Sequence, residues 1–132
     1  TYTGLPNDPL ENGQPKKDGS CNSVFPKLTS IPPGRKAIVL TSEDAHGSPA
    51  LTSDHGVCSD ASGPPDAYDF GFCRKVWDAL RSCADTGTYC EYAIADTPQH
   101  RHIGIWPDGT PIIGLKVQSA APIRADPVPS RE

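Results

Sequence analysis

The order of apolar and polar residues along this chain predicts one helix and, after it, three short strands. From Asp69 onward, apolar residues recur with the spacing i, i+3, i+4, i+7 and i+11, and they are Cys73, Val76, Trp77, Leu80 and Ala84. This spacing is typical of one stripe of a helix, so we expect a helix over about 69–84 that packs this stripe on a core. Asp66 or Asp69 can cap its start, and Gly87 stands where a left-handed C-cap residue is usual.

Three segments after the helix have the length and composition of strands. They are rich in Tyr, Ile, Val and Thr, and they span residues 88–95, 100–106 and 110–117. Pro107-Asp108-Gly109 is a tight-turn signature, because proline presets its own φ and glycine accepts a positive one. An earlier apolar run over 36–41 predicts one more strand. We therefore expect an α+β fold, with one main helix packed on a small antiparallel sheet made of a three-stranded meander and the earlier strand.

The length of 132 residues predicts a single domain flanked by proline-rich segments. Fifteen Pro and twelve Gly indicate many ordered loops. We expect a Pro-rich arm over 1–35, the α+β domain over 36–118 and a flexible tail over 119–132. The polar stretch between the first strand and the helix is long enough to suggest a functional loop. Its His46 and His55 are candidates to line a site, and the alternative is that they face solvent.

Five Cys and no Met in a small, loop-rich chain favour an oxidising compartment, and therefore a secreted protein. Two disulfides and one free thiol are expected. A Cys83–Cys90 bridge would tie the helix end to the first predicted strand, and a Cys21–Cys58 bridge would close the front half, which leaves Cys73 unpaired. Five reduced cysteines in a cytosolic domain are the alternative.

Charge and composition argue against several classes of function. The net charge is −4 and no Lys/Arg run occurs, which argues against binding to duplex DNA, although cutting small or single-stranded RNA needs only a few local cations. No apolar run approaches the length of a membrane span, and no signal peptide is visible. The start at Thr1 rather than Met suggests a mature product or an excised domain. Cys-x-x-Cys pairs, glycine-rich phosphate loops and His-Glu-x-x-His helices are absent, so no cofactor is expected.

Period-2 alternation along the predicted strands places polar and aromatic side chains on one open face, which is the main candidate site. A carboxylate and an imidazole on neighbouring strands can act as general base and general acid, and a nearby cation can hold a phosphate. We expect Glu91 as the base, His102 as the acid, Lys116 with His100 as phosphate contacts, and Tyr89 and Trp106 as rings that stack a base.

Over roughly thirty residues this region resembles the secreted microbial guanyl-preferring ribonucleases. The family places its catalytic Glu in a strand of the type Glu-aromatic-x-Ile, matched by Glu91-Tyr92-Ala93-Ile94, and a basic residue leads a following strand, as His100, Arg101 and His102 do. The resemblance implies a small extracellular enzyme of toxin or effector type that cleaves RNA, with a cognate inhibitor as a further partner. The family's catalytic His near the end of the domain has no counterpart, and alternation turns Arg101 inward. Either the acid has moved to His102, or the scaffold only binds.

Other interpretations use the same residues differently. Cys73 at the opening of the helix is an alternative nucleophile, because a helix N-terminus lowers the pKa of a thiol. Its partner would be His102, whose segment His-Ile-Gly-Ile-Trp looks like the His strand of papain-like cell-wall amidases, although the Asp-Cys-Ser-Gly type of sequence around the nucleophile is missing. His100-x-His102 is also a usual pair of Zn or Cu ligands, which His46, His55 or Glu91 would have to complete.

The last interpretation needs no catalytic residue. In it the chain is a disulfide-stabilised secreted domain whose His and Glu side chains are surface residues, and it acts as a binding module, inhibitor or effector.

Overall fold

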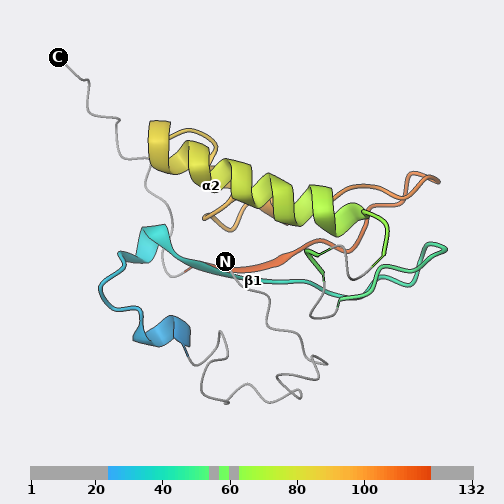
Figure 1. The fold of residues 1–132 in the computed structure, drawn as a ribbon, viewed down its shortest axis with the longest axis horizontal. Helices are drawn as coiled ribbons and strands as arrows, with labels where there is room; N and C mark the ends of the chain where they lie inside the picture. The colour runs from blue at the N-terminus through green and yellow to red at the C-terminus, as the bar shows by residue number, and fades with distance from the viewer. Residues whose placement is uncertain (1–23, 54–56, 60–62, 120–132) are drawn as a thin grey trace.

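The computed structural model describes residues 24–53, 57–59 and 63–119. One long helix, α2 (Lys75–Thr86), packs over a two-stranded antiparallel sheet of β1 (Ala37–Leu40) and β2 (Lys116–Ser119), as Figure 1 shows. The expected α+β class is confirmed. A two-stranded ribbon alone is marginal in water, so the apolar layer between helix and sheet must stabilise it.

The sheet joins the two ends of the described chain. Val39 lies opposite Val117, and Leu40 lies opposite Lys116. Ile38 and Val39 are buried, which confirms the strand predicted from the apolar run over 36–41. β2 begins at Lys116, close to the end of the segment in which the third strand was expected.

The three-stranded meander is wrong, and its first two predicted strands contain short helices instead. In residues 88–95 the chain forms a 3-10 helix at Cys90–Tyr92, because Tyr89 takes a left-handed φ of 63° and turns the backbone. The second predicted strand is entered by a short helix, α3 (Pro98–Arg101). Its N-cap residue is Thr97, whose side chain accepts the His100 backbone N–H at 3.1 Å. A Thr N-cap followed by proline is a strong helix start, and it outweighs the β propensity of the residues that follow.

The predicted turn at Pro107-Asp108-Gly109 is confirmed. The Trp106 N–H donates to the Thr110 carbonyl at 2.7 Å, the Gly109 N–H donates to the Trp106 carbonyl at 2.9 Å, and Gly109 has a φ of 88°. Only a single bridge, Ile105 to Pro111, continues the pairing beyond the turn. The hairpin therefore exists as a tight turn with short arms and not as two regular strands.

The helical segment starts and ends where its caps predict. Asp66 accepts the Tyr68 N–H at 2.7 Å and Asp69 accepts the Asp66 N–H at 2.8 Å, the reciprocal pattern of a capping box. A π-helical turn (Asp69–Arg74) follows and leads directly into α2, which stops at Gly87 with a φ of 71°.

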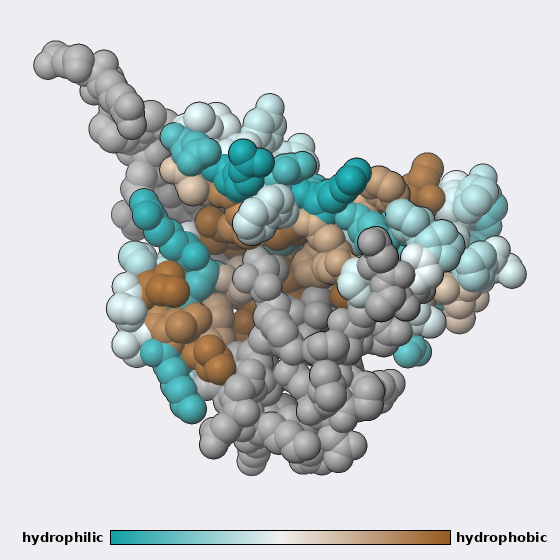
Figure 2. All heavy atoms as spheres, viewed as in Figure 1, coloured by the Kyte–Doolittle hydropathy of each residue, from teal (hydrophilic) through white to brown (hydrophobic). Residues whose placement is uncertain are grey.

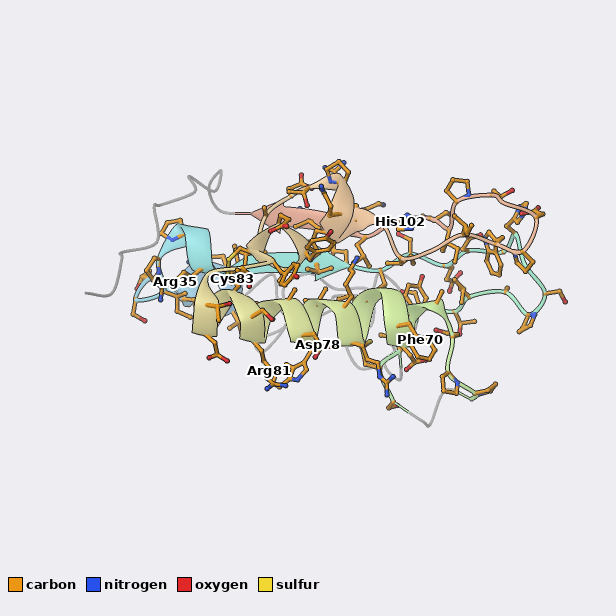
Figure 3. All side chains as sticks on the ribbon, turned by 90° about the horizontal axis from the view of Figure 1, so that it is seen from above. Arg35, Phe70, Asp78, Arg81, Cys83 and His102 are labelled. Carbon is orange, nitrogen blue, oxygen red and sulfur yellow. A yellow bond between two sulfur atoms is a disulfide. The ribbon has the colours of Figure 1, made fainter. Side chains whose placement is uncertain are left out.

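The predicted stripe of this segment is confirmed in part. Val76 is buried, and Cys73 and Leu80 pack partly buried against the core, whereas Trp77 is 63% exposed and Ala84 is also exposed. The stripe is rotated toward Tyr68, Phe72 and Ala79, which are buried against the sheet beneath the helix. Figure 2 shows hydrophilic residues along the outer side of the helix and hydrophobic ones below it, and in Figure 3 Arg81 points away from the strands, as expected for the polar face.

Two disulfides cross-link the described part of the chain. Cys83–Cys90, with a Cα–Cα distance of 4.9 Å, confirms one predicted bridge. Cys58 pairs with Cys73 at a Cα–Cα distance of 5.9 Å, so the predicted Cys21–Cys58 bridge and the unpaired Cys73 are both wrong. Both pairings were compatible with the spacing in the sequence; the packing of the loop against the helix selects between them. Cys21 lies outside the described residues.

Parts of the predicted arm and tail fall outside the described residues, as does His55. Within the described part of the arm, 3-10 helices form at Phe25–Lys27 and Pro33–Arg35. Of the helices in the described ranges, none has the length and apolar character needed to cross a membrane.

Lys75, at the start of α2, is partly buried and points toward α3. Its ammonium group donates to the carbonyl oxygens of Gln99 (3.1 Å), His100 (2.8 Å) and His102 (2.5 Å), at the C-terminal end of α3. Partial burial lowers the pKa of Lys75 to about 8, so the group is still mostly protonated at neutral pH. Lys75 therefore caps α3 and fixes it to α2.

We expect Lys75→Met to lower the free energy of unfolding at pH 7 by about 1–2 kcal/mol, because three carbonyl groups lose their donor while the apolar stem is kept. Denaturant unfolding measures the change. The matched control is Lys116→Met on β2, where the side chain is exposed and we expect a change within about 0.5 kcal/mol. Equal losses in the two variants would show that Lys75 has no capping role.

Candidate functional site

The residues predicted to form the open face lie on separate segments. Glu91 is exposed on the 3-10 helix, His102 is exposed after α3, and Lys116 is exposed on β2. Within the described ranges no hydrogen bond or ion pair joins any two of them. Strict alternation along paired strands was the reason to place them together, and the first two of those strands are absent, so alternation no longer supports a shared face. His102 and Lys116 still follow neighbouring backbone positions, because the Leu115 N–H donates to the Arg101 carbonyl oxygen at 2.8 Å.

His100 is fully buried and cannot serve as a surface cation for phosphate. Its Nδ1 lies 2.8 Å from the carbonyl oxygen of Ala95, which makes Nδ1–H the donor. Its Nε2 is buried and has no hydrogen-bond partner among the described residues. Burial, as the largest cause, lowers the pKa of His100, so the ring is neutral at pH 7. The role of His100 is structural, at the end of a helix that Lys75 already caps.

The other predicted sites are also changed. Cys73 is bridged and offers no thiolate, which excludes a Cys73–His102 hydrolase in this oxidised form. His100 is buried and His102 is exposed, so they do not project from one face as metal ligands would. No group of three or more His, Cys, Asp or Glu side chains within the described ranges could hold a metal ion. Tyr89 is 59% exposed. Its ring meets that of Tyr92 edge-on, with 6.1 Å between the two ring centroids.

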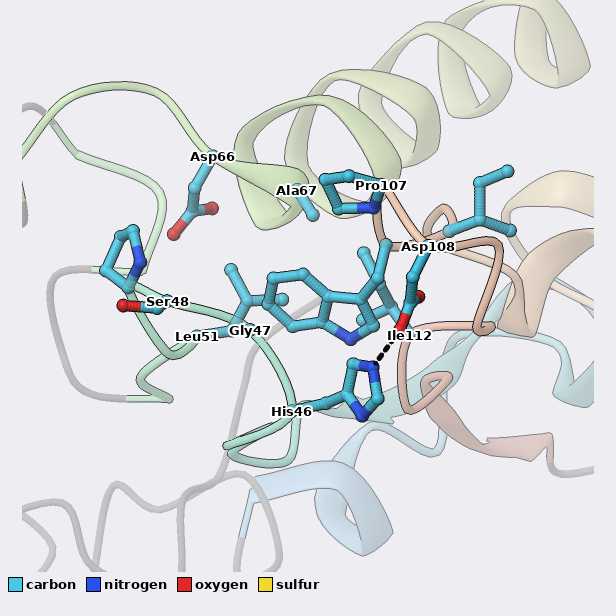
Figure 4. Close-up of a pocket in the computed structure, with 12 residues that line it drawn as sticks. His46, Gly47, Ser48, Leu51, Asp66, Ala67, Pro107, Asp108 and Ile112 are labelled. Atoms are coloured by element: carbon cyan, nitrogen blue, oxygen red, sulfur yellow. Dashed lines mark hydrogen bonds and ion pairs between the residues drawn. The ribbon is translucent and has the colours of Figure 1, made fainter.

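The structure instead brings three distant segments together around a pocket of about 530 Å³ (Figure 4). They are the loop after β1, the start of the helical segment and the turn that follows Ile105. Most of the wall is apolar, and the lining side chains that can carry charge are His46, Asp66 and Asp108. Among the lining residues that belong to the described ranges, neither Lys nor Arg occurs.

Trp106 is fixed in this pocket from two directions. Its indole N–H donates to Asp44 Oδ2 at 3.1 Å. The ring lies against the backbone of Gly47, where a Cβ atom would come within 1.9 Å of it. Any side chain at position 47 would therefore displace the indole. The ring is half-buried, and its orientation is set before any ligand arrives.

Asp44 is the buried anion that organises this region. Besides the indole, it accepts the Ile113 backbone N–H at 2.8 Å and the His46 backbone N–H at 3.0 Å. These two backbone donors, with Ile113 the larger cause, lower the pKa of Asp44. Asp44 as a whole residue is only 4% exposed, and these donors replace water that its carboxylate loses.

His46 and Asp108 are joined by a hydrogen bond at the rim, with 2.7 Å between Nε2 and Oδ2. The backbone N–H of Thr110, followed by the His46 side chain, lowers the pKa of Asp108 to about 2. Asp108 is therefore ionised at any ordinary pH and orients the imidazole. An imidazole held by a carboxylate is the arrangement used for general acid–base catalysis, although it also occurs without catalysis. The His46 ring lies 6.0 Å from Trp106.

Sequence reasoning found parts of this pocket without assembling them. It named His46 as a loop candidate, Trp106 as a ring that contacts a ligand, and Asp108 as part of a turn. It missed Asp44 and Gly47, because nothing local marks a residue whose partner lies 62 positions further on.

Comparison with protein-family models, with curated proteins and with solved structures found no match to this chain. The site therefore has to be interpreted from its own chemistry.

The burial of neutral His100 predicts a loss of stability in mild acid. Its folded-state pKa lies below the unfolded value of about 6.5, so the unfolded chain binds the proton first as the pH falls. We expect the free energy of unfolding to fall below about pH 6.5, with a slope of at most ~1.4 kcal/mol per pH unit from this group.

Denaturant unfolding between pH 7 and pH 5 checks this. His100→Gln should flatten the pH dependence, and His102→Gln, which alters an exposed imidazole, should preserve it. A pH dependence that follows His102 instead would contradict the assignment.

Proposed function

We propose that this chain is a small recognition domain, stabilised by disulfides, that binds its ligand in the pocket around Trp106. The observation that carries the proposal is the fixed Trp106 ring, held by Asp44 and by the backbone of Gly47. An aromatic ring immobilised before binding offers a large contact area and loses little conformational entropy when a ligand arrives.

The size and lining of the pocket support this function. Ligand pockets typically measure about 300–1,000 Å³ and combine apolar walls with a few polar groups that orient the ligand. The pocket around Trp106 falls in this range and has that composition. The open face expected from the sequence has no such support, because its members lie on separate segments.

Electrostatics favour recognition over cleavage of RNA in this pocket. A phosphodiester needs nearby cations, and the residues lining the pocket include two aspartates and neither Lys nor Arg. Cleavage of RNA through Glu91 and His102 stays a prediction from the sequence resemblance.

We place the domain in an oxidising compartment outside the cytosol. Support comes from its two disulfides, Cys58–Cys73 and Cys83–Cys90, in a chain whose sheet has only two strands in the described part. Secretion as an effector or inhibitor is compatible with this placement.

A second candidate function is acid–base hydrolysis, and the His46–Asp108 pair is the observation that favours it. In this case the imidazole would take a proton from a water molecule or hydroxyl group of a substrate lying on Trp106. The catalytic His would then come from the loop after β1 and not from the segment after α3.

The first test of the recognition proposal is a small-molecule screen on isotope-labelled protein, monitored through the indole N–H signal of Trp106. We expect ligands to shift this signal and to leave that of Trp77, which is exposed on α2, unchanged. Gly47→Ala should abolish the response, because the added methyl group overlaps the ring. Gly34→Ala is the matched control, since a Cβ there meets no atom within 4 Å. Ligands that still bind after Gly47→Ala would place the site elsewhere.

Cleavage assays separate the two functions. With RNA and peptide substrates, we expect the recognition domain to show no turnover above background. Turnover that is lost in His46→Gln and kept in Glu91→Gln would replace the first proposal by the second. Turnover lost in Glu91→Gln and kept in His46→Gln would show that catalysis uses the residues that the sequence resemblance implies, and would contradict both proposals.

A further inference from the structure

We infer that the ligand of this pocket carries an organic cation, an ammonium or guanidinium group on an apolar stem, which lies on Trp106 between two carboxylates. The inference rests on the proposed recognition function and adds the chemical class of the ligand.

The charges around the pocket are of one sign apart from the paired imidazole. Asp66 and Asp108 lie on opposite sides of it (Figure 4), and the lining residues in the described part of the chain include no Lys or Arg. Asp66 accepts one backbone N–H through Oδ1, which leaves Oδ2 without a partner in the described part of the chain. A positively charged group would meet attraction from both sides, whereas an anion would meet repulsion.

The orientation of Trp106 leaves its ring face, and not its polar edge, for a ligand. The indole N–H is already donated to Asp44, so it is not available to bind an anionic or carbonyl oxygen. The face of an indole carries negative electrostatic potential and attracts ammonium and guanidinium groups. Trp is the strongest aromatic side chain in this respect.

The walls favour an organic over an inorganic cation. Methyl and methylene groups can bury apolar surface against the aliphatic part of the lining, which consists of Leu51, Ile105, Ile112, Pro49 and Pro107. A hydrated metal ion gains nothing from such a surface. Within the described ranges no cluster of three side chains suited to a metal ion exists either.

Matched probes test the inference. The cations are choline and Nα-acetylarginine amide, and their uncharged counterparts are the neutral carbon analogue of choline and Nα-acetylcitrulline amide. Binding is followed by the fluorescence of Trp106 in a Trp77→Phe background, which removes the signal of the exposed indole on α2. We expect each cation to bind about tenfold more tightly than its neutral counterpart.

Replacement of single carboxylates identifies which aspartate interacts with the charge of the ligand. Asp66→Asn and Asp108→Asn keep the oxygen that accepts a backbone N–H, so both turns should persist. We expect each to weaken the binding of cations by about two- to fivefold and to leave that of the neutral probes unchanged. Asp78→Asn, on the outer side of α2, makes the same charge change away from the pocket and should have no effect.

The outcomes distinguish the two levels of the proposal. Equal binding of charged and neutral probes, or preferential binding of acetate or of a nucleoside monophosphate, would overturn the cation inference and leave a recognition pocket. A failure of every probe, charged or neutral, to change the Trp106 signal would overturn the cation inference and count against the pocket itself. Weaker cation binding in Asp78→Asn to the same degree would show that net charge alone is responsible.

Discussion

The buried carboxylate of Asp44 is the interaction on which the candidate site depends. It receives the Trp106 indole and the backbone N–H groups of Ile113 and His46, and so connects the loop after β1 to the segment between the turn and β2. Asp44 is 4% exposed, and a buried carboxylate is unfavourable without such donors, so each of the three contacts compensates part of the hydration that it loses. The two ends of the same loop are paired by two backbone hydrogen bonds between Asp44 and Leu51. The position of the aromatic ring is therefore a consequence of satisfying one buried charge.

The rest of the fold compensates for a small sheet with cross-links. The helical segment is tied to the loop before it by Cys58–Cys73 and to the 3-10 helix after it by Cys83–Cys90. Lys75 adds a third connection, because it caps α3 from α2. A disulfide of this kind contributes about 2–4 kcal/mol, mainly by restricting the unfolded chain, so two bridges are comparable with the whole stability of a small domain. Of these cross-links, Cys58–Cys73 holds the start of the helical segment, which borders the pocket, to the loop before it.

The function proposed from the structure differs from the expectation of the sequence for an electrostatic reason. The sequence offered a carboxylate, imidazoles and a lysine within one short region, a set of residues suited to cleaving RNA. In the structure these groups lie on three different elements with no hydrogen bond or ion pair between them in the described ranges, and one of the imidazoles is buried and neutral. The groups that do converge are two carboxylates, an imidazole paired with one of them, and an indole whose N–H is already used. Such a set repels phosphate and attracts cations, so the same composition supports a different ligand once its arrangement is known.

By itself, the sequence determined only local features of the structure. The caps and extent of the helix, the turn at 107–109, the strand at 37–40 and the Cys83–Cys90 bridge each depend on residues close together in the chain, whose preferences act without help from distant partners. The tertiary structure alone decided that Phe72 and Ala79 are buried while Trp77 is exposed, that Cys58 pairs with Cys73, and that the predicted meander gives way to short helices. It also decided the site, because Asp44 and Trp106 are 62 positions apart and no periodicity connects them. Contacts at that separation arise only when the packing of helix on sheet brings the two loops together.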